Sequence, residues 1–141
     1  MKKVLLPLLL LGLVFLGAGC SSAPIGTGLG VELAGIERTA DGGATATVRI
    51  VNPNTVAYNV YSGTYRIALG NGYTGTFTVT KPTGIPAQST GTHTGTLTAA
   101  AGATPGPGEI SYRLEARLEL TLWDDQKETA KLNASGSLVV K

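Results

Sequence analysis

Apolar and polar residues alternate along most of this chain, and the alternation predicts β-strands. In the clearest segment every second residue from Ile110 to Leu122 is apolar or aromatic, and the residues between them are polar or charged. At a helical repeat the same apolar residues would scatter around the cylinder, so a helix is excluded here. The period-two pattern recurs and predicts seven strands, at about 29–38, 44–52, 57–69, 73–80, 89–99, 109–123 and 127–140.

Each predicted strand has one apolar face, which a second layer must cover. Asp41-Gly42-Gly43 and Asn71-Gly72 lie between predicted strands, where tight turns need such residues. We therefore predict an all-β fold, an antiparallel two-sheet sandwich of about seven strands resembling immunoglobulin or fibronectin III domains. Residues 99–108 are rich in Ala, Gly and Pro, and we expect them to cross between the sheets rather than form a hairpin.

The first twenty residues have a different character. Lys2 and Lys3 precede an apolar run from Val4 to Leu16, and small residues then lead to Cys20. A basic start, a short apolar segment and small residues before a cleavage site are typical of a signal peptide. A run of about 13 residues, at roughly 1.5 Å per residue, is too short to span a bilayer core of about 30 Å, which makes a transmembrane helix the weaker interpretation.

The segment Leu16-Gly17-Ala18-Gly19-Cys20 resembles the lipobox of bacterial lipoproteins. Gly17 stands where the lipobox usually has Leu, so a plain secretory cut remains an alternative. We predict a signal peptide at 1–19, a tether at 20–28 that begins with a fatty-acylated Cys20, and the sandwich domain at 29–141. The predicted location is the cell envelope, at the outer membrane if the host has one, because Ser21 rather than Asp follows the cysteine.

Charge and cysteine content exclude several functions. The chain has 11 Lys+Arg and 9 Asp+Glu, and Lys2 and Lys3 account for the excess. The mature chain is therefore near neutral, which argues against a basic surface for nucleic acid. With Cys20 acylated no thiol remains, so a disulfide or a cysteine metal site is also excluded.

Candidate chemistry is sparse. His93 is the only histidine, and its neighbours Thr92 and Thr94 offer no carboxylate or thiol at triad or ligand spacing. We interpret His93 as a half-exposed strand residue. Carboxylates gather at positions 124, 125 and 128 and could bind calcium, but a solvated turn is the favoured interpretation. We predict no catalytic residue, cofactor, metal or small-molecule substrate, and no enzyme activity.

Two further features have a structural and a functional interpretation each. Arg113, Glu115, Arg117 and Glu119 alternate in sign along one strand face, which predicts cross-strand ion pairs on a solvated surface rather than a binding stripe. Trp123, the single tryptophan, is interpreted as a plug at one end of the sandwich, with an exposed contact as the alternative.

Asn52-Pro53-Asn54 is the most distinctive turn in the sequence. Pro53 has no N–H to continue a ladder and holds Asn52 extended, so the strand ends there. The flanking asparagine side chains can hydrogen-bond nearby backbone groups. We interpret the motif as a structural turn, and an exposed recognition loop is the alternative.

An ordered series of short motifs resembles a known family. The motifs are Val48-Arg-Ile-Val-Asn-Pro-Asn54, Val60-x-x-Gly63-x-Tyr65-x-Ile67-x-Leu69-x-Asn71-Gly72, Ile85-Pro86-Ala87, Ile110-x-Tyr112-x-Leu114-x-Ala116-x-Leu118 and Leu132-x-Ala134-x-Gly136-x-Leu138. Together they span roughly residues 30–140. The series resembles the group 2 late embryogenesis abundant (LEA) proteins, which share the water-stress and hypersensitive-response (WHy) domain.

The resemblance implies a non-enzymatic protein that protects the cell envelope during desiccation or related water stress. Its expected contacts are the membrane, through the lipid on Cys20, and a client or envelope protein. The alternative is a sandwich interaction module that binds an envelope protein partner through an edge strand or loops. Sandwich folds host many functions, so the fold alone does not choose between the two.

Overall fold

The computed structural model describes residues 28–122 and 125–141. The predicted signal peptide, Cys20, most of the tether, Trp123 and Asp124 lie outside the described residues. Nine strands and no helix are found in the described part of the chain. The strands are β1 Gly30–Arg38, β2 Ala44–Asn52, β3 Tyr58–Leu69, β4 Thr74–Val79, β5 Thr83–Ile85, β6 Ser89–Thr96, β7 Thr98–Ala101, β8 Gly108–Thr121 and β9 Lys127–Val140.

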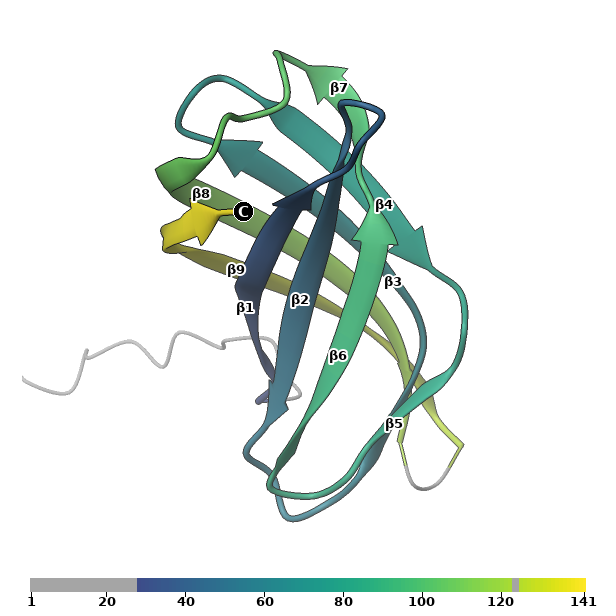
Figure 1. The fold of residues 1–141 in the computed structure, drawn as a ribbon. Helices are drawn as coiled ribbons and strands as arrows, with labels where there is room; N and C mark the ends of the chain where they lie inside the picture. Colours follow the sequence, from purple (N-terminus) through teal and green to yellow (C-terminus); the bar gives the residue numbers. More distant parts are fainter. Residues whose placement is uncertain (1–27, 123–124) are drawn as a thin grey trace, which may run out of the picture.

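The strands form two sheets that face each other (Figure 1). The small sheet has three strands in the order β1-β2-β6, and the large sheet has six, in the order β7-β4-β3-β8-β9 with β5 also paired to β3. Every recorded strand pair is antiparallel. The predicted antiparallel two-sheet sandwich is therefore confirmed.

The prediction was wrong about where the chain changes sheets. The strand predicted at 89–99 is divided at Leu97 into β6, in the small sheet, and β7, which pairs with β4 in the large sheet. The Leu97 N–H donates to the carbonyl oxygen of Ala44 at 2.8 Å, which holds the chain where it changes sheets. Threonine alternates without interruption through this segment, so the period-two pattern does not reveal the switch. The three residues of β5 were also missed.

The core lies between the two sheets and follows the alternation of the sequence. In β2, the buried residues Ala46, Val48 and Ile50 alternate with Thr47 and Arg49 on the outer face. Burial of such apolar side chains contributes about 25 cal/mol per Å² removed from water, which is the main force that holds the sheets together. The alternation of the sequence is therefore what fixes which face of each strand points inward.

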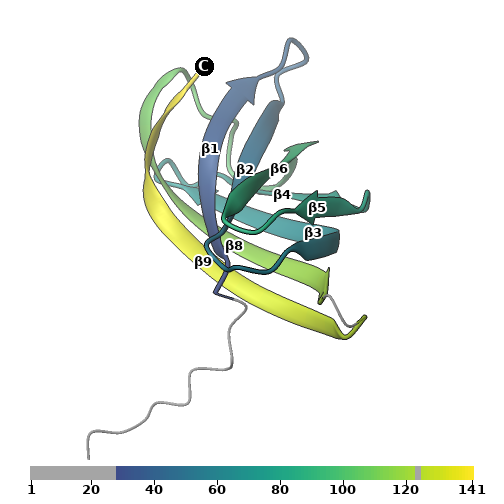
Figure 2. The same cartoon turned by 90° about the horizontal axis from the view of Figure 1, so that it is seen from below.

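One side of the sandwich is closed by contacts between the end of β1 and the residue that follows β9. The N–H of Arg38 donates to the carbonyl oxygen of Lys141 at 2.8 Å, and the N–H of Lys141 donates to that of Ile36 at 3.1 Å. The end of β1 in the small sheet is thereby tied to the residue that follows β9 in the large sheet. Figure 2 shows the curvature of β8 and β9, which brings β9 against β1.

Candidate functional site

The interpretation of His93 as a half-exposed residue was wrong, because the side chain is 2% exposed. It lies on the inner face of β6 and points between the sheets, toward Tyr65 of β3. Its neighbours on that face are Gly91 and Gly95, which leave room for core side chains. A Cβ on Gly95 would lie 2.4 Å from the Phe77 ring. Because glycine carries no hydropathy signal, the sequence did not reveal which face of β6 is buried.

Both ring nitrogens of His93 have a hydroxyl partner. Nδ1 lies 2.6 Å from the Tyr65 hydroxyl, and Nε2 lies 3.0 Å from Oγ1 of Thr83 in β5. The Thr83 hydroxyl donates in turn to the carbonyl oxygen of Lys81, at 3.3 Å. Since the single Thr83 proton is used there, Thr83 accepts from Nε2–H, and the Tyr65 O–H donates to Nδ1. The contacts therefore favour the neutral Nε2–H tautomer and form one directed chain of hydrogen bonds.

Burial keeps this chain uncharged. Desolvation lowers the pKa of His93 below its usual value and raises the pKa of Tyr65 above its usual value. The recorded hydrogen-bond partners of the imidazole are hydroxyl groups, and neither is a carboxylate that could stabilise an imidazolium. The Tyr65 ring also stacks on Phe77, with centroids 4.6 Å apart. The geometry suits a polar clamp between the sheets and does not present a base to a substrate.

Asn52, in the Asn-Pro-Asn turn, is another buried polar side chain with several hydrogen-bond partners. It is 1% exposed. Its Nδ2 donates to the carbonyl oxygens of Val56 at 2.8 Å and Pro86 at 3.0 Å, with that of Ile85 at 3.4 Å. Its Oδ1 accepts from the backbone N–H and the side-chain amide of Asn54, both at 3.1 Å. One amide thus joins the loop after β2 to the loop before β6.

Pro53 is exposed next to this buried amide. The Asn54 carbonyl oxygen accepts from the N–H of Gln88 at 2.9 Å, which adds a backbone contact between the same two loops. Gln88 has a φ of 50°, in the left-handed region that side chains other than glycine seldom adopt. The motif therefore holds two distant segments together at one end of the sandwich.

The outer faces of both sheets carry many hydroxyl groups, together with charged residues. On the small sheet, Thr45 and Thr47 of β2 face Thr96 and Thr94 of β6, and the Thr47 and Thr94 hydroxyls lie 3.2 Å apart. The large sheet carries further threonines and serines between its charged residues. They include Ser62, Thr64, Thr74, Thr76, Thr78, Ser111, Thr129, Ser135 and Ser137.

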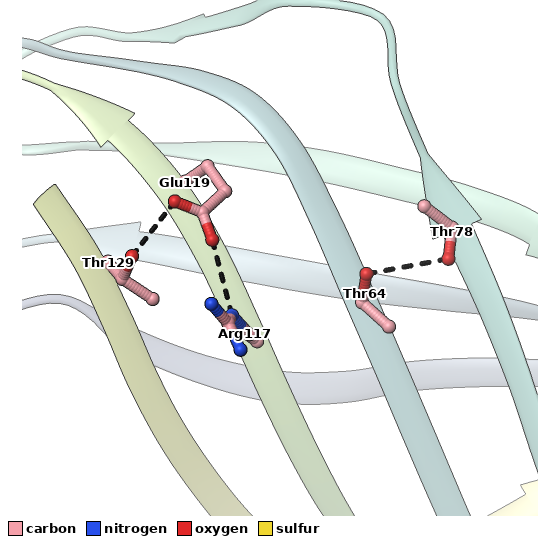
Figure 3. A network of polar contacts seen from close by, with 5 residues as sticks. All are labelled: Thr64, Thr78, Arg117, Glu119 and Thr129. Atoms are coloured by element: carbon pink, nitrogen blue, oxygen red, sulfur yellow. Dashed lines mark hydrogen bonds and ion pairs between the residues drawn. The ribbon is translucent and has the colours of Figure 1, made fainter. Parts of the chain in front are cut away.

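Ion pairs on the large sheet differ from those expected. The recorded pair of the alternating stripe runs along β8, from Nε of Arg117 to Oε1 of Glu119 at 3.2 Å, and Thr129 of β9 donates to Oε2 of the same carboxylate at 2.8 Å (Figure 3). These contacts lower the pKa of Glu119, the Thr129 hydrogen bond more than Arg117. A cross-strand ion pair is found instead on the small sheet, between Arg49 and Glu32.

The described surface offers little for catalysis or metal binding. Its main depressions lie on the outer face of β8 and β9 and are lined by residues such as Arg113, Glu115, Asn133 and Ser135. Within residues 28–122 and 125–141, no group of three His, Cys, Asp or Glu side chains could hold a metal ion. The same residues include no helix able to cross a membrane. Asp125 and Glu128 are described, but Asp124 of that cluster is not.

Solved structures share this fold at low sequence identity. The X-ray structure of the structural-genomics target SoR45 matches with a TM-score of 0.53 and 16% identity, over 82% of this chain and 88% of that chain. The solution structure of the candidate LEA protein At2g46140.1 matches with a TM-score of 0.51 and 15% identity, over 79% and 70% of the two chains. The solution structure of AT1g01470 from Arabidopsis thaliana has a TM-score of 0.49 at 14% identity.

The first two likenesses show that the chain shares a sandwich fold with both proteins, one of which is a candidate LEA protein. At these identities they show the fold alone. No protein-family model matches the sequence, and no curated protein matches it.

Proposed function

We propose that this protein is a non-enzymatic, lipid-anchored envelope protein whose LEA-type domain protects neighbouring molecules during water loss. The observation that carries the proposal is the set of threonine hydroxyls on the outer faces of β2 and β6 in one sheet and of β3 and β4 in the other, on a LEA-like sandwich. The buried position of His93, with both ring nitrogens bonded, adds support because it removes the only histidine from reaction with a substrate.

The physical route is replacement of water. Threonine hydroxyls both donate and accept hydrogen bonds, so they can bond to polar groups that lose their water on drying. On the sheet faces, exposed threonines such as Thr64 and Thr78 are held by rigid strands. The domain can therefore present hydrogen-bonding groups without unfolding and without exposing its apolar core.

The anchor would place this surface at a membrane. Acyl chains contribute about 0.8 kcal/mol for each buried CH2, and two or three chains give durable attachment. Mass spectrometry of the mature N-terminus tests this step. We expect a protein that begins at an acylated Cys20 and a C20S variant without lipid, whereas an unmodified Cys20 in the mature protein would contradict the anchor.

The protective role is tested by drying a labile enzyme with the purified protein and measuring activity after rehydration. We expect the wild type to preserve activity, and the variant T64V/T76V/T78V to preserve clearly less, because valine keeps the shape of threonine and removes its hydroxyl. Circular dichroism must show that both are folded. Equal recovery with and without the wild type would reject the role, as would unchanged survival on drying of a strain lacking the gene.

A further inference from the structure

The outer edge of β6 has no described strand hydrogen-bonded to it, although β4 and β5 of the large sheet approach β6 from the inner side of the sandwich. β6 pairs with β2 over its whole length, from Ser89 to Thr96, and with no other described strand. The backbone hydrogen bonds recorded outside the strand ladders join none of these residues to another segment. Alternate N–H and C=O groups of an edge strand point away from the sheet, so this edge can accept another strand.

The other described edges carry features that hinder pairing. β9 has Lys127 and Lys131, and residue Lys141 after it is bonded to the end of β1. β1 has an irregularity between Leu33 and Gly35. β5 and β7 are only 3 and 4 residues long. Charged residues, irregular backbone and short length are the devices by which proteins block edge pairing.

β6 has none of these devices. Its sequence is Ser-Thr-Gly-Thr-His-Thr-Gly-Thr, with no charge and no proline, and its eight residues pair without a register shift. Its threonines Thr90, Thr92, Thr94 and Thr96 are exposed, and its inner face is filled by the core. An added strand would therefore meet backbone groups and hydroxyls, with no charge to desolvate.

The sequence of β6 also identifies the strand that fits it. Around His93 the residues read the same in both directions: Thr92 and Thr94, then Gly91 and Gly95, then Thr90 and Thr96. Two copies placed antiparallel about a two-fold axis at His93 would set each threonine opposite a threonine and each glycine opposite a glycine. A two-fold interface requires this kind of self-complementary surface.

We propose that β6 pairs antiparallel with β6 of a second copy of this chain. The two three-stranded sheets then become one continuous sheet, with the order β1-β2-β6-β6-β2-β1. Threonine pairs of this kind already stabilise the sheet within one copy, where the hydroxyls of Thr47 and Thr94 lie 3.2 Å apart. The inference does not depend on the proposed protective role.

The first test is the mass of the protein by sedimentation velocity across a concentration series. All chains carry C20S, so that no acyl group drives association. We expect wild-type β6 to give a monomer–dimer equilibrium. The variants T92K/T94K and T92E/T94E place like charges opposite each other. For each variant alone, the dissociation constant of the dimer should rise by about tenfold or more. A monomer at every concentration of the wild type overturns the proposal.

Mixing separates the proposed interface from any other. An equimolar mixture of T92K/T94K and T92E/T94E should restore dimers, because lysines then face glutamates. In an equimolar mixture of the single variants T92K and T94E, the heterodimer should be more stable than either homodimer, because residue 92 of one copy then faces residue 94 of the other. No preference for the heterodimer would contradict this register. If the charged variants dimerise as well as the wild type, the dimer uses a different surface and the proposal is wrong.

The matched control is T45K, which places a lysine on the same outer face but on the central strand β2, whose two edges are already paired. It should dimerise like the wild type. Hydrogen exchange gives a second readout. Alternate amides of β6 should gain protection as concentration rises, while those of β9 should not. Protection at β6 only after addition of an extended peptide, with no wild-type dimer, would assign the edge to a foreign strand instead.

Discussion

The polar side chains inside the sandwich and those on its outer faces make similar hydrogen bonds in very different surroundings. Inside, Tyr65 and His93 meet at 2.6 Å, and the histidine is 2% exposed. Outside, Arg117 and Glu119 meet at 3.2 Å with side chains 61% and 44% exposed. Water can replace the outer contact as soon as it breaks, but it cannot reach the inner one.

The inner contacts therefore bear on the stability of the fold, and the outer contacts bear on the proposed protective role. The inner contacts tie segments together that are far apart in the sequence, so losing one leaves a buried group without a partner. The outer contacts are interchangeable with water, which is what a surface needs if it is to bond other molecules on drying. Interior variants should therefore change stability strongly, and outer variants should change it little.

The largest effect is expected for Asn52→Ala. The change leaves the carbonyl oxygens of Val56 and Pro86 without their side-chain donor and removes the acceptor of Asn54. These hydrogen bonds are part-buried and each contributes about 0.5–1.5 kcal/mol, so we expect the loss of several to lower the free energy of unfolding by about 3 kcal/mol. Urea denaturation measures it. Asn54→Ala, which leaves the Asn52 donors in place, is the control and should cost less.

Tyr65→Phe should have the next largest effect. It keeps the ring that stacks on Phe77 but leaves Nδ1 of His93 without its donor, at an expected cost of about 1–2 kcal/mol. A double-mutant cycle with His93→Phe isolates the contact, because the second change should cost less once the hydroxyl is gone. Additive losses would mean that the two groups do not interact.

The pH dependence of stability should follow His93. Its pKa is lowered by burial, so the unfolded chain, with a histidine pKa of about 6.5, takes up the proton first as pH falls. The contribution of the neutral His93 to the free energy of unfolding is complete above that pH. It is lost as the pH falls below it, by at most about 1.4 kcal/mol per pH unit. Urea denaturation between about pH 7.5 and about pH 5 measures this loss. His93→Phe should flatten the profile in this window, and an unchanged slope would contradict the assignment.

The smallest effect is expected for Arg117→Gln. Its ion pair with Glu119 lies on the surface, and the carboxylate keeps the hydroxyl of Thr129. We expect an unfolding midpoint indistinguishable from that of the wild type, in low and in high salt. A clear loss of stability that salt abolishes would show that the outer network is more than a solvated contact.

Much of the fold could be predicted from the sequence, because in most strands the alternation of apolar and polar residues shows which face is buried. In β8, leucines and alanine alternate with charged residues, so the inward face is unambiguous. β6 and β7 do not show such a pattern, because the threonine and glycine of β6 and the alanines of β7 have no strong preference for the inner or the outer face. The burial of His93 and the change of sheet at Leu97 were missed for this reason.

The candidate sites show a similar limit. The role of Asn52 as a link between two loops depends on Pro86, 34 residues away, and no local pattern encodes that contact. The chain from Tyr65 to His93 joins residues 28 positions apart on different sheets. Turn chemistry indicated that the Asn-Pro-Asn motif was special, but only the packing of the strands shows what its side chains touch.

The most direct test of the account is the drying assay with one outer and one interior variant side by side. Before drying, T64V/T76V/T78V and Y65F are both brought to conditions where circular dichroism shows full folding. We predict that the outer variant loses protection of the labile enzyme while remaining stable, and that Y65F protects like the wild type despite its lower stability. Full protection by the outer variant together with loss of protection by folded Y65F would contradict the account.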